Sequence, residues 1–226
     1  MSIFGTPSKG SGGQIANGDA FAAAVNTGAG DLIVVAVGWG SSTIVIDSLS
    51  DTAGNTFLPG TRVTNIVGAH QLFYCIGAAA NASNIVRTHF HSTGVNYSYI
   101  YVWSVPVSGG SAALDVQATG ASSSASNHPS TGSFSTTGTD EIVFAGAIND
   151  FSGITYTHGT GYAIDGAALV SGLAGTEEAT FSSAQTGIVA DFSQSSSTDW
   201  LIGAMAFMKS TGGGGGSAQP VVCVMQ

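Results

Sequence analysis

Two histidines separated by one residue, His89 and His91, have the spacing of a pair of metal ligands. Residues two apart in a strand point to the same face, so both imidazoles would reach one ion. A third ligand could come from His70 or from an aspartate on a neighbouring strand. An acid shortly after the pair would complete such a site, but Ser92 and Thr93 follow it. An exposed polar strand face explains the pair as well. His89 and His91 are therefore weak metal candidates, and we expect no cofactor.

Two adjacent acids, Glu177 and Glu178, could serve as an acid and base pair. Neighbouring residues on a strand point to opposite faces of the sheet. The two carboxyl groups therefore cannot flank one glycosidic bond, as hydrolysis requires. A serine nucleophile would need a Gly-x-Ser-x-Gly elbow, and the sequence contains none. We expect no catalytic residues and no enzymatic activity.

Aromatic residues alternate with smaller ones along residues 97–105. In a strand this alternation places the aromatic side chains on one face. Such a ladder is either the core face of a sandwich or an exposed platform that stacks on sugars. We keep both alternatives and take these residues as candidate ligand or partner contacts: Tyr97, Tyr99, Tyr101 and Trp103.

The segment around residue 51 offers side-chain oxygens in another pattern. Asp47, Asp51 and Asn55 could form an oxygen cage for calcium, but their spacing fits no established calcium loop. Aspartate and asparagine also cap turns with their own side chains, and Gly54 can take a positive φ. We therefore predict an ordinary turn at residues 51–55.

Three uninterrupted apolar runs must position these side chains, at residues 32–37, 141–147 and 200–207. Runs of this length that are bounded by turn residues are typical of strands buried on both faces. We predict that they are the central strands of one sandwich. An acid precedes each of the first two runs, at Asp31 and Asp140. This weak internal repeat suggests that the sandwich consists of two similar halves.

The remaining pattern also indicates strands. Short β-rich segments recur every ~8–12 residues between Gly, Asn and Ser turns, the signal of a sandwich or jelly roll. We predict an all-β fold, a single jelly-roll-like antiparallel β-sandwich with an extended N-terminal arm and a Gly-rich C-terminal tail. The expected boundaries are 1–28 for the arm and edge strand, 29–209 for the sandwich, and 210–226 for the tether and tail peptide.

The tail peptide follows a five-glycine tether and is apolar. It could dock on its own domain, insert as a strand into a neighbouring subunit, or be an expression remnant. We favour docking on a neighbouring subunit, through Val221, Val222 and Val224. Cys75 lies in an apolar segment, which predicts a small buried hydrophobic residue. A disulfide between Cys75 and Cys223 would form only if the tail folds back.

The composition excludes several partners. The formal net charge is −9, with four Lys and Arg residues scattered along the chain. Nucleic-acid binding needs several cations on one face, and an anionic membrane has the same requirement. We expect neither partner. The N-terminus lacks a basic segment followed by an apolar one, so we expect no secretory signal. We expect instead a virion or an extracellular surface as the location.

Several motifs, read in order, resemble a family of bacterial secreted and phage-encoded β-sandwich modules. They are Gly30-Asp31-Leu32 with Trp39, and residues 50–57, 71–75, 80–86, 113–115 and 199–200. The resemblance covers residues 10–208. It departs from the family at residues 102–106, where an acid is usual and Val-Trp-Ser-Val-Pro stands here. The resemblance implies a jelly-roll-like module on cell surfaces or virions, and it implies no catalytic residues.

The prediction for function is a non-enzymatic virion structural protein. We expect a phage capsid decoration, or cement, protein that binds neighbouring subunits, with other virion proteins as partners and a homo-oligomer, a trimer, as the assembly. The alternative is a carbohydrate-binding adhesin, either a tail-fibre tip or a bacterial surface module, with a glycan as its ligand.

Overall fold

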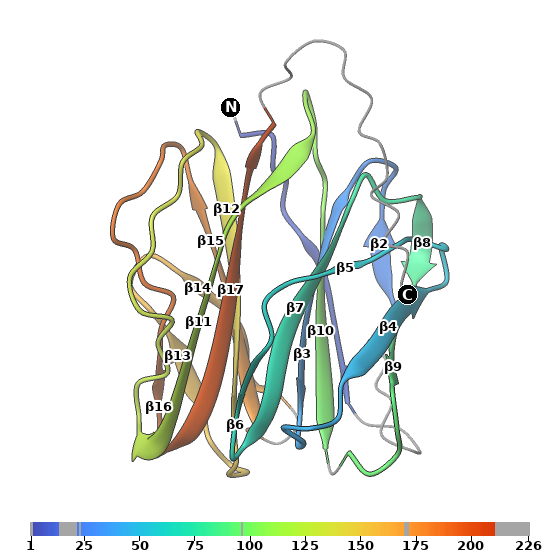
Figure 1. The fold of residues 1–226 in the computed structure, drawn as a ribbon. Helices are drawn as coiled ribbons and strands as arrows, with labels where there is room; N and C mark the ends of the chain where they lie inside the picture. The colour runs from blue at the N-terminus through green and yellow to red at the C-terminus, as the bar shows by residue number, and fades with distance from the viewer. Residues whose placement is uncertain (1, 14–21, 23, 96, 170–171, 211–226) are drawn as a thin grey trace, which may run out of the picture.

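The computed structural model describes residues 2–13, 22, 24–95, 97–169 and 172–210. These residues form two large antiparallel sheets that pack face to face, with smaller paired strands on the outer sides (Figure 1). The described residues contain no helix, so none of them forms a helical membrane span. The predicted all-β class is confirmed.

The first large sheet is built from the N-terminal half of the chain. Its strand order is β1 (Ser8–Gly13), β10 (Ser98–Val105), β3 (Leu32–Trp39), β7 (Gly68–Ile76) and β5 (Leu58–Pro59), and β6 (Val63–Asn65) also pairs with β7. Every residue of β3 and β10 is buried. Both strands are rich in β-branched and aromatic side chains, which suit a strand covered on both faces.

The second large sheet is built from the C-terminal half. Its strand order is β11 (Ala112–Ser126), β17 (Thr198–Lys209), β12 (Glu141–Asn149), β15 (Ala174–Phe181) and β14 (Ala163–Leu169). All of β12 is buried, and so is most of β17. The three predicted apolar runs are therefore β3, β12 and β17, one in the first sheet and two in the second.

Short strands cover the outer face of each large sheet. The first sheet is covered by β2 (Val25–Thr27) paired with β8 (Asn81–Asn84), and by β4 (Ile46–Asp51) paired with β9 (Val86–Phe90). The second is covered by β13 (Tyr156–His158) paired with β16 (Phe192–Gln194). The molecule thus has four layers, which explains why the central strands are apolar on both faces.

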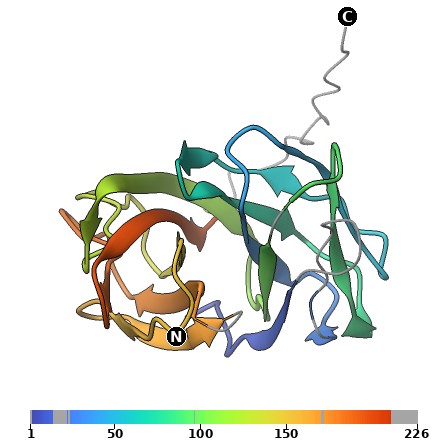
Figure 2. The same ribbon diagram turned by 90° about the horizontal axis from the view of Figure 1, so that it is seen from below.

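The two halves repeat one topology. With β2, β6 and β8 set aside, each half contributes seven strands, and its large sheet has the order first, seventh, second, fifth, fourth. In each half the third strand pairs with the sixth, as β4–β9 and as β13–β16. We call these halves the first unit and the second unit. Viewed along the strands, the two units lie side by side (Figure 2). The jelly-roll connectivity of a single sandwich is not confirmed, because each large sheet comes from one half of the chain.

The same turn precedes the second strand of each unit. In the first unit the Gly28 N–H donates to Asp31 Oδ2 at 2.7 Å, and in the second the Gly138 N–H donates to Glu141 Oε1 at 2.7 Å. The residue before each acid has a positive φ, +88° at Gly30 and +63° at Asp140. The repeated pattern is Thr-Gly-x-x-acid, and it places Glu141, rather than Asp140, opposite Asp31.

An apolar core joins the two units. Inward-facing side chains of β3 and β10 meet those of β12 and β17 in one buried cluster. Aromatic rings cross this interface, with Trp103 and Phe144 centroids 5.0 Å apart and Tyr74 and Phe207 centroids 5.4 Å apart. Separate apolar clusters lie between each large sheet and its own cover. The inter-unit core therefore holds the two sheets together as one sandwich.

Candidate functional site

The aromatic ladder lies inside the protein. Tyr99, Tyr101 and Trp103 are 1 %, 5 % and 0 % exposed, because the second sheet covers the inner face of β10, with β12 and β14 against these side chains. Tyr97 is half-buried, and its hydroxyl donates to the Val67 carbonyl at 2.9 Å. The alternative of an exposed platform that stacks on sugars is therefore wrong for Tyr99, Tyr101 and Trp103. These three side chains belong to the core face of the sandwich, the other alternative.

The histidine pair does not come together with a third ligand. His89 Nε2 lies 2.7 Å from Ser50 Oγ, and His91 Nδ1 lies 3.1 Å from Asp47 Oδ1. His70 is buried in the inter-unit core, while β9 belongs to the outer cover. Across the described part of the chain, no three His, Cys, Asp or Glu side chains form a group that could hold a metal ion.

The segment at residues 51–55 is the predicted turn. Asp51 Oδ1 accepts the Asn55 N–H at 2.8 Å, and Asp51 Oδ2 accepts the side-chain amides of Asn55 and Asn84 at 2.7 and 2.8 Å. Gly54 has a φ of +77°. Both carboxylate oxygens are occupied by protein donors, which explains the aspartate without a calcium ion.

A buried polar pair lies between the two sheets. His70 Nε2 is 2.8 Å from the Tyr99 hydroxyl, and His70 Nδ1 has no hydrogen-bond partner. Gly146 and Gly203 face each other across β12 and β17, and a Cβ on either would lie 3.0 Å from a His70 ring nitrogen. The imidazole thus fills the space that two glycines leave. Burial lowers the pKa of His70 from 6.5 to about 3, so the ring is neutral.

A charged cluster closes one edge of the sandwich. Lys9 on β1 binds the Asp165 carboxylate on β14 and lies 3.0 Å from Glu178 Oε1 on β15. The Trp103 indole N–H donates to Asp165 Oδ2 at 2.6 Å. These bonds join the first unit to the second, and they account for Glu178 as a structural residue.

Glu177 points to the opposite face of β15 and is fully buried. Its Oε2 accepts the Gly159 N–H at 2.9 Å, whereas its Oε1 has no partner. Burial raises the pKa of Glu177 to about 8; the nearby Asp191 charge also raises it, and the Gly159 hydrogen bond lowers it. Glu177 and Glu178 therefore lie on different faces and share no substrate position.

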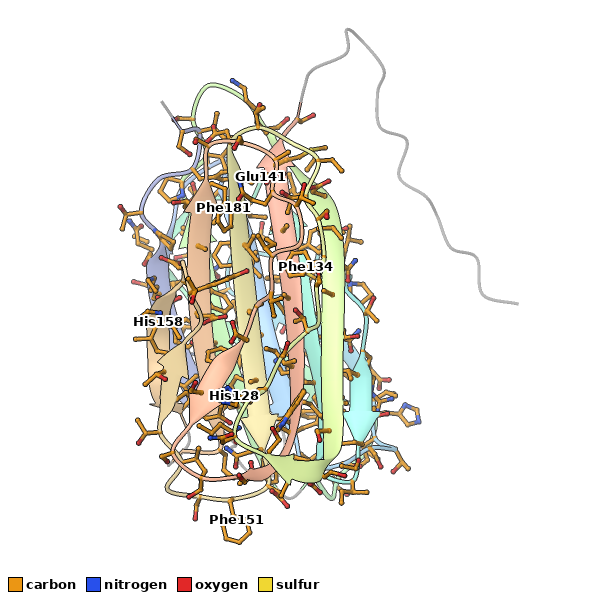
Figure 3. All side chains as sticks on the ribbon, turned by 90° about the vertical axis from the view of Figure 1, so that its left-hand side faces the viewer. His128, Phe134, Glu141, Phe151, His158 and Phe181 are labelled. Atoms are coloured by element: carbon orange, nitrogen blue, oxygen red, sulfur yellow. The ribbon has the colours of Figure 1, made fainter. Side chains whose placement is uncertain are left out.

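Among the described residues, the two most exposed large apolar side chains are at the end of the sandwich away from Ile3 and Lys209. Ile66 is 78 % exposed and Phe151 is 64 % exposed. Figure 3 shows Phe151 at this end, with Glu141 at the other. Ile66 belongs to the first unit and Phe151 to the second. The Tyr97 hydroxyl joins their loops, because it contacts the carbonyl oxygens of residues 67 and 149 at 2.9 and 3.4 Å. We call Ile66 and Phe151 the apolar end.

A shallow groove of about 300 Å³ lies on the first unit between β4 and β7. Phe57 and Pro59 line it, together with the polar residues Asp47, Thr56 and Gln71. The Asp47 side chain is 53 % exposed, so its carboxylate is accessible in this groove. Carboxylates beside an aromatic ring can bind sugar hydroxyls, so this groove is a candidate glycan site.

Comparison with known proteins gives no match, whether with family models, curated proteins or solved structures. Of the predicted contact residues, Val221, Val222 and Val224 lie outside the described residues, as does Cys223, while Cys75 is buried. Sequence reasoning missed the apolar end. A signal was present at Phe151, an aromatic residue in the turn sequence Asn-Asp-Phe-Ser-Gly.

Proposed function

We propose that this protein is a non-enzymatic structural protein of a virus particle, a phage capsid decoration protein that binds neighbouring subunits. The single observation that carries the proposal is the apolar end. Two large side chains from different units, Ile66 and Phe151, are exposed there beside small polar residues. Isolated exposed apolar residues are common. Two of them on loops that the Tyr97 hydroxyl joins are a good candidate for a contact with another protein.

The rest of the molecule supports a passive role. Side chains that could do chemistry are engaged in the core, in hydrogen bonds or in ion pairs, as described for His70, Trp103 and Glu178. Four stacked layers with apolar cores give a rigid body. A rigid body that binds across a junction stabilises the junction without moving, which is what a cement protein does.

The proposed partners are copies of this chain, as a trimer, and other virion proteins. The tail at residues 210–226 would extend the contact to a neighbouring subunit. It leaves the sandwich at Lys209, near Ile3, whose N–H donates to Asp140 Oδ2 at 2.5 Å. The apolar end and Lys209, where β17 ends, are thus at opposite ends of the sandwich, so one molecule would contact two neighbours.

Density-gradient purification of virus particles from the source tests this proposal. The full chain should sediment with the particles in a fixed copy number, and removal of residues 210–226 should lower that number or the temperature at which particles open. A chain that stays at the top of the gradient in every preparation would refute the virion assignment.

The groove between β4 and β7 supports a second candidate function, a carbohydrate-binding adhesin. The accessible Asp47 and the ring of Phe57 would provide the contacts, in place of the buried ladder. A glycan array tests this candidate: retention that disappears in Asp47→Asn favours the adhesin, and no retention on any glycan removes it.

A further inference from the structure

One core position differs in kind between the two units. In the first unit Val35 on β3 pairs with Phe73 on β7, and Phe73 packs under the cover. In the second unit the equivalent pair is Ala145 on β12 and Glu177 on β15. The two units thus place a phenyl ring and a carboxyl group at the same point of the same topology. A carboxyl group at a core position needs a compensating partner.

The protein provides a hydrogen-bond partner for only one of the two oxygen atoms of the Glu177 carboxyl group. Glu177 is 0 % exposed and its Oε1 accepts no hydrogen bond. Tyr162, 6 % exposed, also has a hydroxyl without a partner in the same region of the cover. Buried polar groups without partners are rare, and an ion or a water at the site is a common explanation.

Oxygen atoms converge on the turn at Gly159. The Gly159 N–H donates to Glu177 Oε2 at 2.9 Å, and its carbonyl accepts the Tyr162 N–H at 3.2 Å. Asp191 Oδ1 lies 2.3 Å from the point where a Cβ on Gly159 would be. A side chain at residue 159 would therefore collide with the carboxylate. Glycine lets Asp191 approach the same turn that Glu177 holds.

The Lys and Arg side chains lie elsewhere, whereas His158 Nδ1 lies 2.8 Å from the Gly159 carbonyl oxygen. Lys9 binds Asp165 and Glu178, Arg62 lies over the Trp39 ring, and Lys209 ends β17. Arg87 is on β9 in the first unit. The two carboxyl groups of Glu177 and Asp191 therefore need an external positive charge when both are ionised.

We propose that Glu177, Asp191 and Tyr162 bind one hard divalent cation of the calcium class between β15 and the β13–β16 cover. All donors are oxygen atoms, which calcium prefers, and calcium accepts the irregular geometry of a turn. Two carboxylates balance its charge. The ion would tie the cover of the second unit to its sheet, at the position where Phe73 does this in the first unit. The inference is independent of the proposed function.

Thermal unfolding of the full chain at pH 8.5 tests the proposal. Calcium chloride at a hundredfold excess over its Kd should raise the Tm by ~5–10 °C over EDTA. Glu177→Gln should abolish the rise, and Asp191→Asn should reduce it. Glu178→Gln, the adjacent acid on the other face, is the matched control and should keep the full rise. Magnesium should give a smaller rise, because it demands a regular octahedral site.

Terbium provides a second readout that does not depend on stability. This calcium mimic should show luminescence on tyrosine excitation, lost in Tyr162→Phe and displaced by calcium. A single site should appear in isothermal titration. If calcium leaves the wild-type Tm unchanged, or if Glu177→Gln keeps the rise, the carboxyl group is only protonated and the proposal is overturned.

Discussion

The neutral imidazole of His70 predicts a specific loss of stability in acid. The group is fully buried between the sheets, and burial lowers its pKa to about 3, against 6.5 for an ordinary histidine. Above pH 6.5 the ring is neutral in both the folded and the unfolded chain, so its pKa has no effect on stability there. Below pH 6.5 the unfolded chain takes up a proton that the folded chain does not.

The magnitude follows from the difference between the two pKa values. Each pH unit between 6.5 and 3 lowers the free energy of unfolding by about 1.4 kcal/mol, so the full loss is at most about 5 kcal/mol. A typical domain is stable by roughly 5–15 kcal/mol, so the contribution of this one residue is a large share of the total. The raised pKa of Glu177, about 8, acts in the opposite direction between pH 8 and 4.5, so the His70 contribution is measured as a difference between wild type and a His70 variant.

Urea unfolding at pH 7, 6, 5 and 4 provides the assay, with wild type compared with His70→Gln. Glutamine keeps a polar partner for the Tyr99 hydroxyl but does not titrate in this range. The variant should lose less stability between pH 6.5 and 4 than wild type, by about 3 kcal/mol. His91→Gln, at an exposed histidine, is the matched control for the substitution itself. Equal slopes for wild type and His70→Gln would refute the reasoning.

Three further predictions concern glycines and the apolar end. Gly30→Ala should cost about 1–2 kcal/mol of unfolding free energy by denaturant titration, since its φ is +88° and a Cβ there meets no other atom, so backbone strain is the only term; no loss would contradict the strain. Gly203→Ala should cost about 1–3 kcal/mol in the same assay, because its Cβ would lie 2.9 Å from Leu72 Cδ1 and 3.0 Å from His70 Nδ1. An unchanged midpoint would mean that these two side chains have room to move. Ile66→Ser with Phe151→Ser should leave the Tm within ~2 °C of wild type, because both side chains are exposed; a larger drop would show that they support the fold.

The central strands could be predicted from the sequence because a strand that is buried on both faces has an uninterrupted apolar sequence. The runs that became β3, β12 and β17 are apolar without alternation, which only a covered strand tolerates. The acid before the first two runs was also visible. The sequence does not show which acid of the second half corresponds to Asp31, because Asp140 and Glu141 are adjacent. Only the hydrogen bond from the Gly138 N–H identifies Glu141 as the equivalent of Asp31.

The positions of the candidate side chains could not be read in the same way. Alternation shows that Tyr99, Tyr101 and Trp103 share a face, but it cannot show that a distant segment covers that face. The sequence offers His70 as a third ligand beside His89 and His91, whereas β7 places it in the inter-unit core. Pairing between residues far apart in sequence decides both cases, and a local pattern carries little information about it.

Quantitative co-sedimentation of the purified chain with virus particles that lack it tests the central claim most directly. We expect saturable binding by wild type and binding at least ~100-fold weaker for Ile66→Ser with Phe151→Ser, since each large apolar side chain contributes about 1.5–3 kcal/mol when buried. Equal binding by the double variant, or no binding by wild type, would contradict it.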